Sequence, residues 1–327
     1  MLLRFFRSTG SQMIIFIPFL GILLWLHPII AIPQSSYFFD SQPMPLYQWV
    51  TRVFPFHSFL GTMLTLSFVI IQGFLLVRLN TRFIFINNRT YLPALLFVIL
   101  TASVIEVQRL NPVIFSGFFL LLALERLFES FRRDRLANEI FSASFFIAIG
   151  SLFYPFVIFL LLVIWIGIAI LRPFNWREWF FTILGLGTPF FFVFSYYYLV
   201  YNDASLFLSS FFDQFHVKHE YLSYRLPLIT LLIYVMFLLL LSSQFIIKSF
   251  QGKKILQRKA FTLFFWLFFN ILGIYLFIPQ ASVELIYFLA LPLSYLLANY
   301  FVLMRSLFWG NIFLLVLLGL IVWNQFS

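Results

Sequence analysis

The chain has 327 residues, of which 63% are hydrophobic and 10% are charged, and its mean hydropathy is +1.01. Soluble domains carry about 25% charged residues, so the composition excludes a water-soluble fold and predicts one integral membrane domain over residues 1–327. The formal net charge is +10, but the basic residues lie between apolar segments, which indicates membrane topology and no nucleic-acid partner. The absence of cysteine excludes disulfides and thiolate chemistry.

Apolar segments recur along the whole chain and are separated by shorter polar connections. A helix of about 20 residues crosses the hydrocarbon core of a bilayer, and several segments are close to the lower limit of that length. The pattern predicts an all-α polytopic protein with about eleven membrane-spanning helices. The predicted spans are 13–31, 57–78, 91–108, 112–130, 139–154, 155–171, 179–201, 226–247, 260–278, 283–302 and 306–325.

Two segments leave room for a different assignment. The first apolar run resembles a signal peptide, but His27-Pro28 follows it where a cleavage site would need small residues, so we expect it to remain the first span. Tyr154-Pro155 interrupts the run 139–171, because the residue before proline disfavours the helical conformation. We therefore predict two short spans here. One long kinked helix is the alternative, and it would invert everything downstream.

The basic residues decide the predicted orientation, because Lys and Arg concentrate on the cytoplasmic side of membrane proteins. With eleven spans and the N-terminus inside, the C-terminus lies outside, and seventeen of the 21 Lys and Arg fall on the inner side. Inner-side Glu125 and Glu129 lie among arginines and predict a charge-paired helix end. The outer-side cations are Arg52, Arg109, Lys218 and Arg225.

The two longest outer loops, 32–56 and 202–225, are expected to carry the function. Residues 47–54 combine aromatic side chains with one arginine and predict a short helix at the membrane interface. Residues 206–215 space their apolar side chains for one helical face, which also predicts an interfacial helix. All four histidines fall on this outer side.

The predicted catalytic residues are Asp40 and Glu106. Asp40 lies in the first outer loop, where a carboxylate can act as a general base toward an acceptor hydroxyl or hold a metal; an ordinary loop or helix-capping aspartate is the alternative. Glu106 and Arg109 are three residues apart near the outer end of the third span, a spacing that shares one helical face. They form either a local ion pair or a cavity wall in which Glu106 orients Arg109 toward an anion.

Candidate ligand sites lie around these residues. Arg52, Arg109 and Arg225 are predicted to bind the phosphate of a lipid, because guanidinium binds phosphate with two parallel hydrogen bonds. His216, His219 and Glu220 are the candidate ligands of a divalent metal, since histidines at this spacing share a helical face. Interfacial histidines without metal are the alternative, because Lys218 lies between them and repels a cation.

Several function classes lack support in the sequence. There is no phosphate-binding or dinucleotide-binding glycine motif, so nucleotide hydrolysis and dinucleotide redox chemistry are not expected. Ionisable residues are nearly absent from the middle of the predicted spans, and no internal repeat is visible. A proton-driven transporter needs a charged relay across the membrane, so this class is also disfavoured.

The order of these features resembles the GT-C superfamily of polyprenyl-phosphate-sugar glycosyltransferases. The resemblance is architectural, covers about two thirds of the chain, and is closest from Pro93 to Pro173, where short spans surround Gly150-Ser151-Leu152-Phe153-Tyr154-Pro155. It implies a catalytic carboxylate in the first outer loop, at the position of Asp40. In that superfamily the carboxylate is often the first of an acidic pair, whereas Ser41 follows Asp40 here.

The phenylalanine-rich character, with Phe5-Phe6-Arg7-Ser8 and the run Leu171 to Trp179, is also similar to a family of uncharacterised polytopic membrane proteins from Bacteroidota. The leading hypothesis is a transferase, or a degenerate relative of one, at the outer face of the bacterial inner membrane. It would use a polyprenyl-phosphate-linked sugar among its membrane lipids. The alternative hypothesis is a non-catalytic subunit or scaffold that binds other membrane proteins in an envelope assembly.

Overall fold

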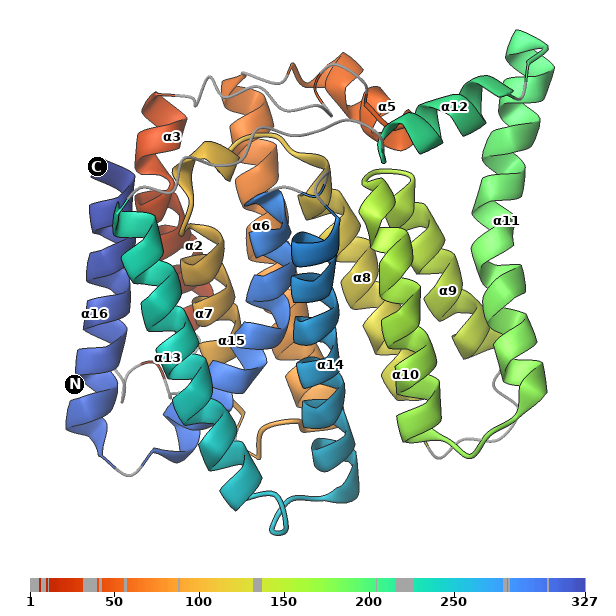
Figure 1. The fold of residues 1–327 in the computed structure, drawn as a ribbon. Coiled ribbons are helices and arrows are strands. Elements are labelled where there is room, and N and C mark those ends of the chain that lie inside the picture. Colours follow the sequence, from red (N-terminus) through yellow and green to blue (C-terminus); the bar gives the residue numbers. More distant parts are fainter. Residues whose placement is uncertain are drawn as a thin grey trace.

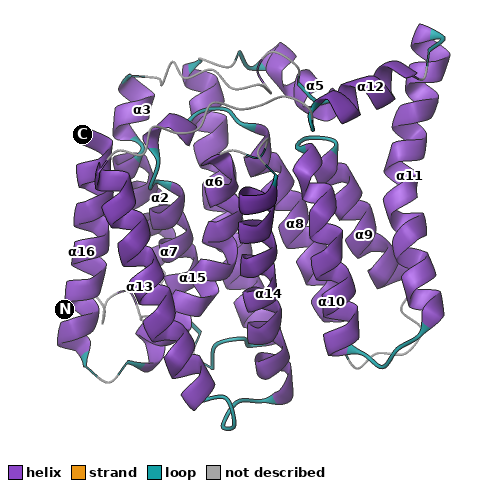
Figure 2. Cartoon of the chain, in the orientation of Figure 1, coloured by secondary structure: helices purple, strands orange, loops and turns teal. Residues whose placement is uncertain are grey.

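The protein is helical wherever its structure is described. The computed structural model describes residues 6, 10, 12–31, 40, 43–55, 58–87, 89–131, 137–203, 205–215, 226–278, 281, 283–304 and 306–326. Within these ranges every regular element is a helix and none is a strand (Figure 2). The all-α prediction is confirmed for this part of the chain.

The helices follow the apolar segments in chain order. The long and medium helices are α2 (Gln12–Leu24), α6 (Phe59–Phe83), α7 (Leu92–Thr101), α8 (Pro112–Glu129), α9 (Ala137–Ser151), α10 (Leu161–Leu171), α11 (Trp176–Tyr201), α13 (Leu226–Lys248), α14 (Ile255–Phe277), α15 (Ile286–Leu303) and α16 (Leu307–Phe326). The short ones are α3 (Leu26–Ile30), α5 (Pro45–Val53), α12 (Ser205–Asp213), η1 (Ile105–Val107), η2 (Pro155–Leu160) and η3 (Val283–Leu285).

The chain is a multi-pass membrane protein by the length and composition of its helices. Six described segments are long and apolar enough to cross a membrane: Phe59–Phe83, Trp176–Tyr201, Leu226–Lys248, Ile255–Phe277, Val283–Leu303 and Leu307–Gln325. Gln12–Leu24, Leu92–Thr101 and Pro155–Leu171 are apolar but shorter. The number of eleven spans and their orientation stay predictions.

The long helices stand side by side in one bundle (Figure 1). We call its upper end the one crossed by α5 and α12, and its lower end the one that holds the connection between α13 and α14 (Figure 1). The chain turns back between α9 and α10, which lie beside each other and are joined at the upper end (Figure 1). The predicted break at Tyr154-Pro155 is therefore present, and the single kinked helix is excluded.

The centre of the bundle is formed by α7 and α15. All ten residues of α7 are buried, and 83% of the most apolar stretch of the segment Val283–Leu303, which contains α15, is buried, against 11% for that of α11. At the edge of the bundle α11 packs on α9, where a side chain at Gly185 would overlap the carbonyl oxygen of Phe141. Gly185 therefore serves close helix packing, as expected for small residues at membrane helix crossings.

The third predicted span, 91–108, is shorter than expected. Helix α7 ends at Thr101, Val104 is extended, and η1 is a separate short turn. Serine and β-branched residues favour helix ends and extended backbone, and α16 supplies partners for the carbonyls released there. Gln325 donates to Ala102 O and Asn324 to Ser103 O, at 3.1 and 2.6 Å.

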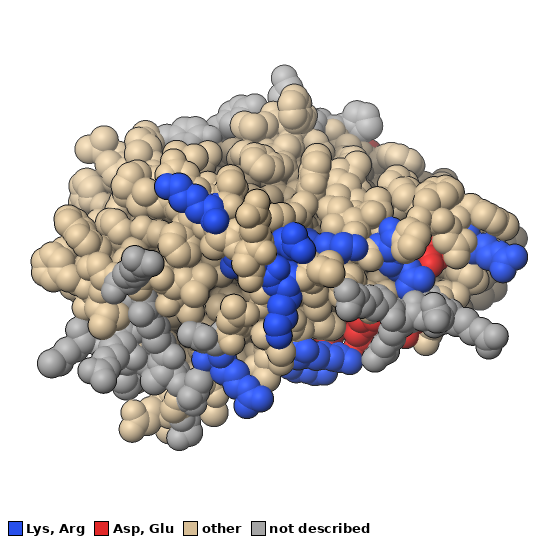
Figure 3. Space-filling view, turned by 90° about the horizontal axis from the view of Figure 1, so that it is seen from below, with Lys and Arg blue, Asp and Glu red and all other residues tan. Residues whose placement is uncertain are grey.

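The lower end carries a network of ion pairs between α6 and α8. Arg82 Nη1 lies 2.6 Å from Glu125 Oε1 and 2.6 Å from Glu129 Oε1. Arg78 and Arg126 add pairs to Glu125 and Glu129, at 3.3 and 2.9 Å. The predicted charge pairing is confirmed, but both glutamates are buried. Viewed from below, Lys and Arg are spread over this end of the bundle (Figure 3).

Candidate functional site

Helix α5 lies across the upper end and packs one of its faces against the bundle. It begins with proline at its first turn, Pro45, after the extended residue Met44. Its inner face packs Tyr47, Val50 and Phe54 against the start of α8. The Tyr47 hydroxyl donates to the Leu110 carbonyl oxygen at 3.1 Å. The interfacial helix predicted for residues 47–54 is thus present as a helix, bound to the bundle through one aromatic face.

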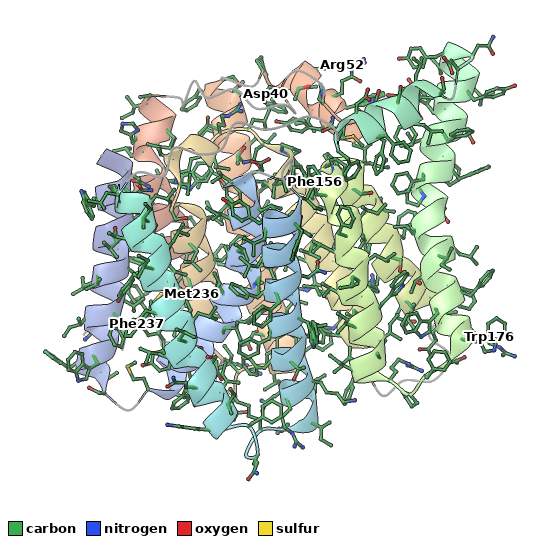
Figure 4. All side chains as sticks on the ribbon, viewed as in Figure 1. Asp40, Arg52, Phe156, Trp176, Met236 and Phe237 are labelled. Atoms are coloured by element: carbon green, nitrogen blue, oxygen red, sulfur yellow. The ribbon has the colours of Figure 1, made fainter. Side chains whose placement is uncertain are left out.

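Beneath α5, Asp40 meets the segment between α7 and α8. Arg109 donates from Nη2 to Asp40 Oδ2 at 2.6 Å and from Nη1 to Asp40 Oδ1 at 3.3 Å. The Arg109 side chain is 0% exposed and the Asp40 side chain is 13% exposed. A two-bond contact of this kind is the strong form of an arginine–carboxylate pair. Asp40 therefore lies between a buried guanidinium and the surface of the upper end (Figure 4).

The turn that presents Arg109 is held by Asn111. The Asn111 side chain accepts a hydrogen bond from Ile114 N at the start of α8, and it donates to Val107 O and Arg109 O at 3.0 and 3.3 Å. Proline at position 112 follows as the first helical residue, where its missing N–H costs nothing. The Asn-Pro pair therefore starts α8 and fixes the backbone on which Arg109 is carried.

A second carboxylate, which is fully buried, lies on the α15 side of this turn. Glu284 in η3 is 1% exposed and accepts a hydrogen bond from the Tyr154 hydroxyl at 3.3 Å. Tyr287 donates to Val107 O at 3.0 Å, so η3 and α15 are tied to the turn that carries Arg109. Burial raises the pKa of Tyr47 well above its usual value, the charges of Asp40 and Glu284 add to this, and Arg109 opposes it. These four side chains share one electrostatic environment, which we call the upper charge cluster.

Gln108 adds open hydrogen-bonding capacity beside the upper charge cluster. It directly precedes Arg109 and is 0% exposed. Neither its Nε2 nor its Oε1 has a hydrogen-bond partner among the described residues. Buried amides are nearly always satisfied, and an unsatisfied one is costly. Such a group is expected where a polar ligand with both donor and acceptor atoms binds.

The structure brings some of the sequence-predicted residues together and separates others. Asp40 and Arg109 are brought together. Arg52 lies on the other face of α5, above Trp49, with its guanidinium carbon 6.0 Å from the ring centre. Glu106 lies in η1, which ends before Arg109; the assumption that one helix carries both residues is wrong, because the helix breaks after Thr101. The structure does not describe the Glu106 side chain.

The remaining candidates lie outside the described residues. These are the phosphate-binding candidate Arg225 and the metal-binding candidates His216, His219 and Glu220. Among the residues that are described, no group of three or more His, Asp or Glu side chains is placed to hold a metal ion. A divalent metal therefore stays a prediction for the second outer loop.

Sequence reasoning missed three members of this region: Tyr47 as a hydrogen-bond donor, Glu284 and Gln108. Glu284 carried a usable signal, since an ionisable residue at the start of an apolar segment is costly unless it is paired. No signal in the sequence indicated that Gln108 is buried, because a polar residue at the end of an apolar segment is ordinarily expected to be exposed.

Comparison with known proteins assigns a family without an activity. The chain belongs to DUF6427, a family of unknown function, whose model matches residues 35–326. No curated protein and no solved structure gives a significant match to the chain.

Proposed function

We propose that this member of DUF6427 is a membrane glycosyltransferase, or a degenerate relative of one, that uses a lipid-linked sugar at its upper end. The observation that carries the proposal is the contact between Asp40 and Arg109, at 2.6 Å, beneath the interfacial helix α5. It places a partly exposed carboxylate of the first outer loop beside a buried cation. This combination suits a reaction in which a proton is accepted and a negative charge develops.

The proposed topology has eleven crossings, with the lower end in the cytoplasm of a bacterium and the upper end outside the inner membrane. The basic residues support it. Arg82 is in the last turn of α6, Lys248 ends α13 and Lys254 precedes α14, and these helix ends lie together at the lower end (Figure 1). Lys and Arg are favoured on the cytoplasmic side. The upper charge cluster then faces the compartment where lipid-linked sugars meet extracytoplasmic acceptors.

The proposed chemistry is a single displacement at the anomeric carbon of the sugar. An acceptor hydroxyl forms the new carbon–oxygen bond as the bond to the lipid phosphate breaks. The hydroxyl proton passes to Asp40, and the negative charge stays on the departing lipid phosphate. Asp40 suits this role because it is a carboxylate whose two oxygens are both oriented by the guanidinium of Arg109. Arg109 stabilises charge in a site of low dielectric, and the Gln108 amide hydrogen-bonds to sugar hydroxyls.

A second candidate function is favoured by the same contact. Asp40 and Arg109 neutralise each other, and the pair ties the first outer loop to the bundle. A non-catalytic subunit of an envelope assembly would use the pair in this structural way. The two candidates differ in what happens when the two charges exchange places, since a structural pair tolerates exchange better than a catalytic one.

The test is sugar transfer by the purified protein in lipid nanodiscs supplied with polyprenyl-phosphate-linked sugars and peptide, glycan and lipid acceptors. Asp40→Asn, which keeps the shape of the side chain, is expected to abolish transfer while the protein remains folded. Asp203→Asn is the matched control, because Asp203 is an exposed upper-end carboxylate that contacts Ser205. The double variant Asp40→Arg with Arg109→Asp is expected to regain stability but not transfer. Transfer by Asp40→Asn at the wild-type rate would reject Asp40 as the base.

A further inference from the structure

A groove with a cationic and aromatic lining lies between the outer face of α5 and the upper part of α11. It encloses about 240 Å³ and is lined from α5 by Gln48, Trp49 and Arg52. From α11 it is lined by tyrosines and by apolar side chains that include Phe192 and Val193. This groove is separated from the upper charge cluster by α5 itself, whose Tyr47 faces inward. The two regions are therefore independent sites.

The groove carries one positive charge that is available to a ligand. Arg52 is exposed and makes no ion pair with any carboxylate that the structure describes. Two carboxylates of the upper end have other partners: Asp40 binds Arg109, and Asp203 accepts from Ser205 N and Oγ at 2.8 and 2.6 Å. The hydroxyls of Tyr196, Tyr197 and Tyr201 add hydrogen-bond donors at the same level of α11. Charge and donors together are complementary to an oxyanion.

The position of the groove along α11 indicates that this oxyanion belongs to a lipid. Helix α11 has 26 residues, so at a rise of 1.5 Å per residue it is about 39 Å long. That exceeds the hydrocarbon thickness of about 30 Å, and its last turns reach the headgroup region. Tyrosine is enriched at that boundary, which fits the tyrosines at 196–198 and 201.

The floor of the groove is apolar and therefore suits the acyl chains of such a lipid. Phe192 and Val193 lie one turn of α11 below the tyrosines, and Leu46 closes the α5 side. Val193 and Leu46 also pack against the buried cluster that α12 forms with Met44 and Leu152. The site therefore changes from polar to apolar along the direction in which a phospholipid changes from phosphate to acyl chain.

We propose that the groove between α5 and α11 binds the phosphate headgroup of an anionic glycerophospholipid from the upper leaflet. Arg52 binds the phosphate, which guanidinium does through two parallel hydrogen bonds. The tyrosine hydroxyls of α11 donate to the remaining headgroup oxygens. The bound lipid would fix α5 against α11 at the membrane surface. This inference goes beyond sugar transfer and does not depend on it.

The experiment measures lipid retention by native mass spectrometry of the full-length protein, delipidated in mild detergent and titrated with phosphatidylglycerol, phosphatidylcholine, polyprenyl phosphate or inorganic phosphate. We expect phosphatidylglycerol to bind most tightly and Arg52→Gln to weaken it roughly tenfold, as for the loss of a charge-assisted contact. Arg177→Gln is the matched control, because Arg177 lies over Trp176 with the same 6.0 Å separation at the opposite end of α11.

Three outcomes would overturn the proposal. The first is undiminished phosphatidylglycerol binding by Arg52→Gln, and the second is an equal loss in Arg177→Gln, which would indicate nonspecific attraction. The third is tighter binding of inorganic phosphate or polyprenyl phosphate than of phosphatidylglycerol. Tyr201→Phe, which keeps the ring and removes one hydroxyl, provides a milder variant that leaves the fold intact and should weaken phosphatidylglycerol binding about threefold. Sugar transfer is assayed separately, so a failure of one proposal leaves the other standing.

Discussion

The two ends of the bundle both hold buried ion pairs, but they bury opposite partners. At the upper end the arginine is the more deeply buried partner: the Arg109 side chain is 0% exposed and the Asp40 side chain is 13% exposed. At the lower end the carboxylates are the more deeply buried partners: the side chains of Glu125 and Glu129 are 10% and 6% exposed, and that of Arg82 is 40% exposed. The upper pair thus leaves its carboxylate more exposed than its arginine, and the lower pairs leave Arg82 more exposed than their carboxylates. An accessible carboxylate can accept a proton, whereas an accessible arginine cannot.

The two pairs also differ in how the chain builds them. Arg78 and Arg82 are one helical turn apart on α6, and Glu125 and Glu129 are one turn apart on α8, so the lower network follows from helix periodicity. The upper pair joins residues 69 positions apart, and both lie in segments between long helices. Each lower carboxylate contacts two arginines, whereas the upper pair joins one arginine to one carboxylate through two hydrogen bonds. Loss of one partner should therefore matter more at the upper end.

The largest expected effect comes from Asp40→Ala. It leaves the guanidinium of Arg109 buried without its carboxylate, and breaking a buried pair in this way costs about 3–5 kcal/mol. The measurement is the free energy of unfolding in a denaturing-detergent titration of the purified protein. If this variant is as stable as wild type, the claim that the upper pair contributes more than the lower network is contradicted, because other groups would then stabilise the charge of Arg109.

Arg82→Gln tests the other side of the same comparison. Glu125 keeps Arg78 at 3.3 Å and Glu129 keeps Arg126 at 2.9 Å, so we expect a loss of about 1.5–3 kcal/mol, the usual range for hydrogen bonds to charged groups. The same unfolding titration measures it. A loss larger than that of Asp40→Ala would show that the lower network, and not the upper pair, holds the helices together.

These outcomes bear on what the sequence could predict. Helix α13 was expected at 226–247 and is observed at Leu226–Lys248, because a long apolar run between polar connections has one solution in a membrane. The same span assignment predicted that Asp40 and Arg109 lie at the same end of the bundle, which their contact confirms. The contact itself was not predicted, because it depends on the path of an irregular loop. The end of α7 at Thr101 depends on side chains of α16, more than 200 positions later, and no local pattern shows them.

Two buried glutamines, one beside the upper charge cluster and one in the helix core, differ in whether their amides have a hydrogen-bond partner among the described residues. Gln108→Leu removes an amide that is buried without a partner, so we expect stability to rise by about 1 kcal/mol. Gln72→Leu is the matched control, because Gln72 is also buried but donates to Ile114 O at 2.8 Å, and we expect it to lose about 1 kcal/mol. If Gln108 contacts sugar hydroxyls, its leucine variant also shows weaker binding of lipid-linked sugar despite its greater stability. A destabilised Gln108→Leu would indicate that the amide is satisfied in the native protein.

The smallest effect concerns a lysine that the lower end partly buries. Lys253 lies between α13 and α14, donates to Asn299 Oδ1 at 2.9 Å and sits 4.5 Å from the Phe261 ring centre. Burial lowers the pKa of Lys253 from 10.5 to about 8. Between pH 8 and 10.5 the unfolded chain therefore binds more protons at this site than the folded protein does, and stability rises with pH across that window.

The thermal unfolding temperature of the wild type should rise from pH 8 to 10, and Lys253→Met should remove the part of that rise that Lys253 contributes. Lys254→Met, an exposed neighbour, should retain it. An unchanged pH profile in Lys253→Met would show that Lys253 is solvated at the lower end, as the exposed Lys254 beside it is.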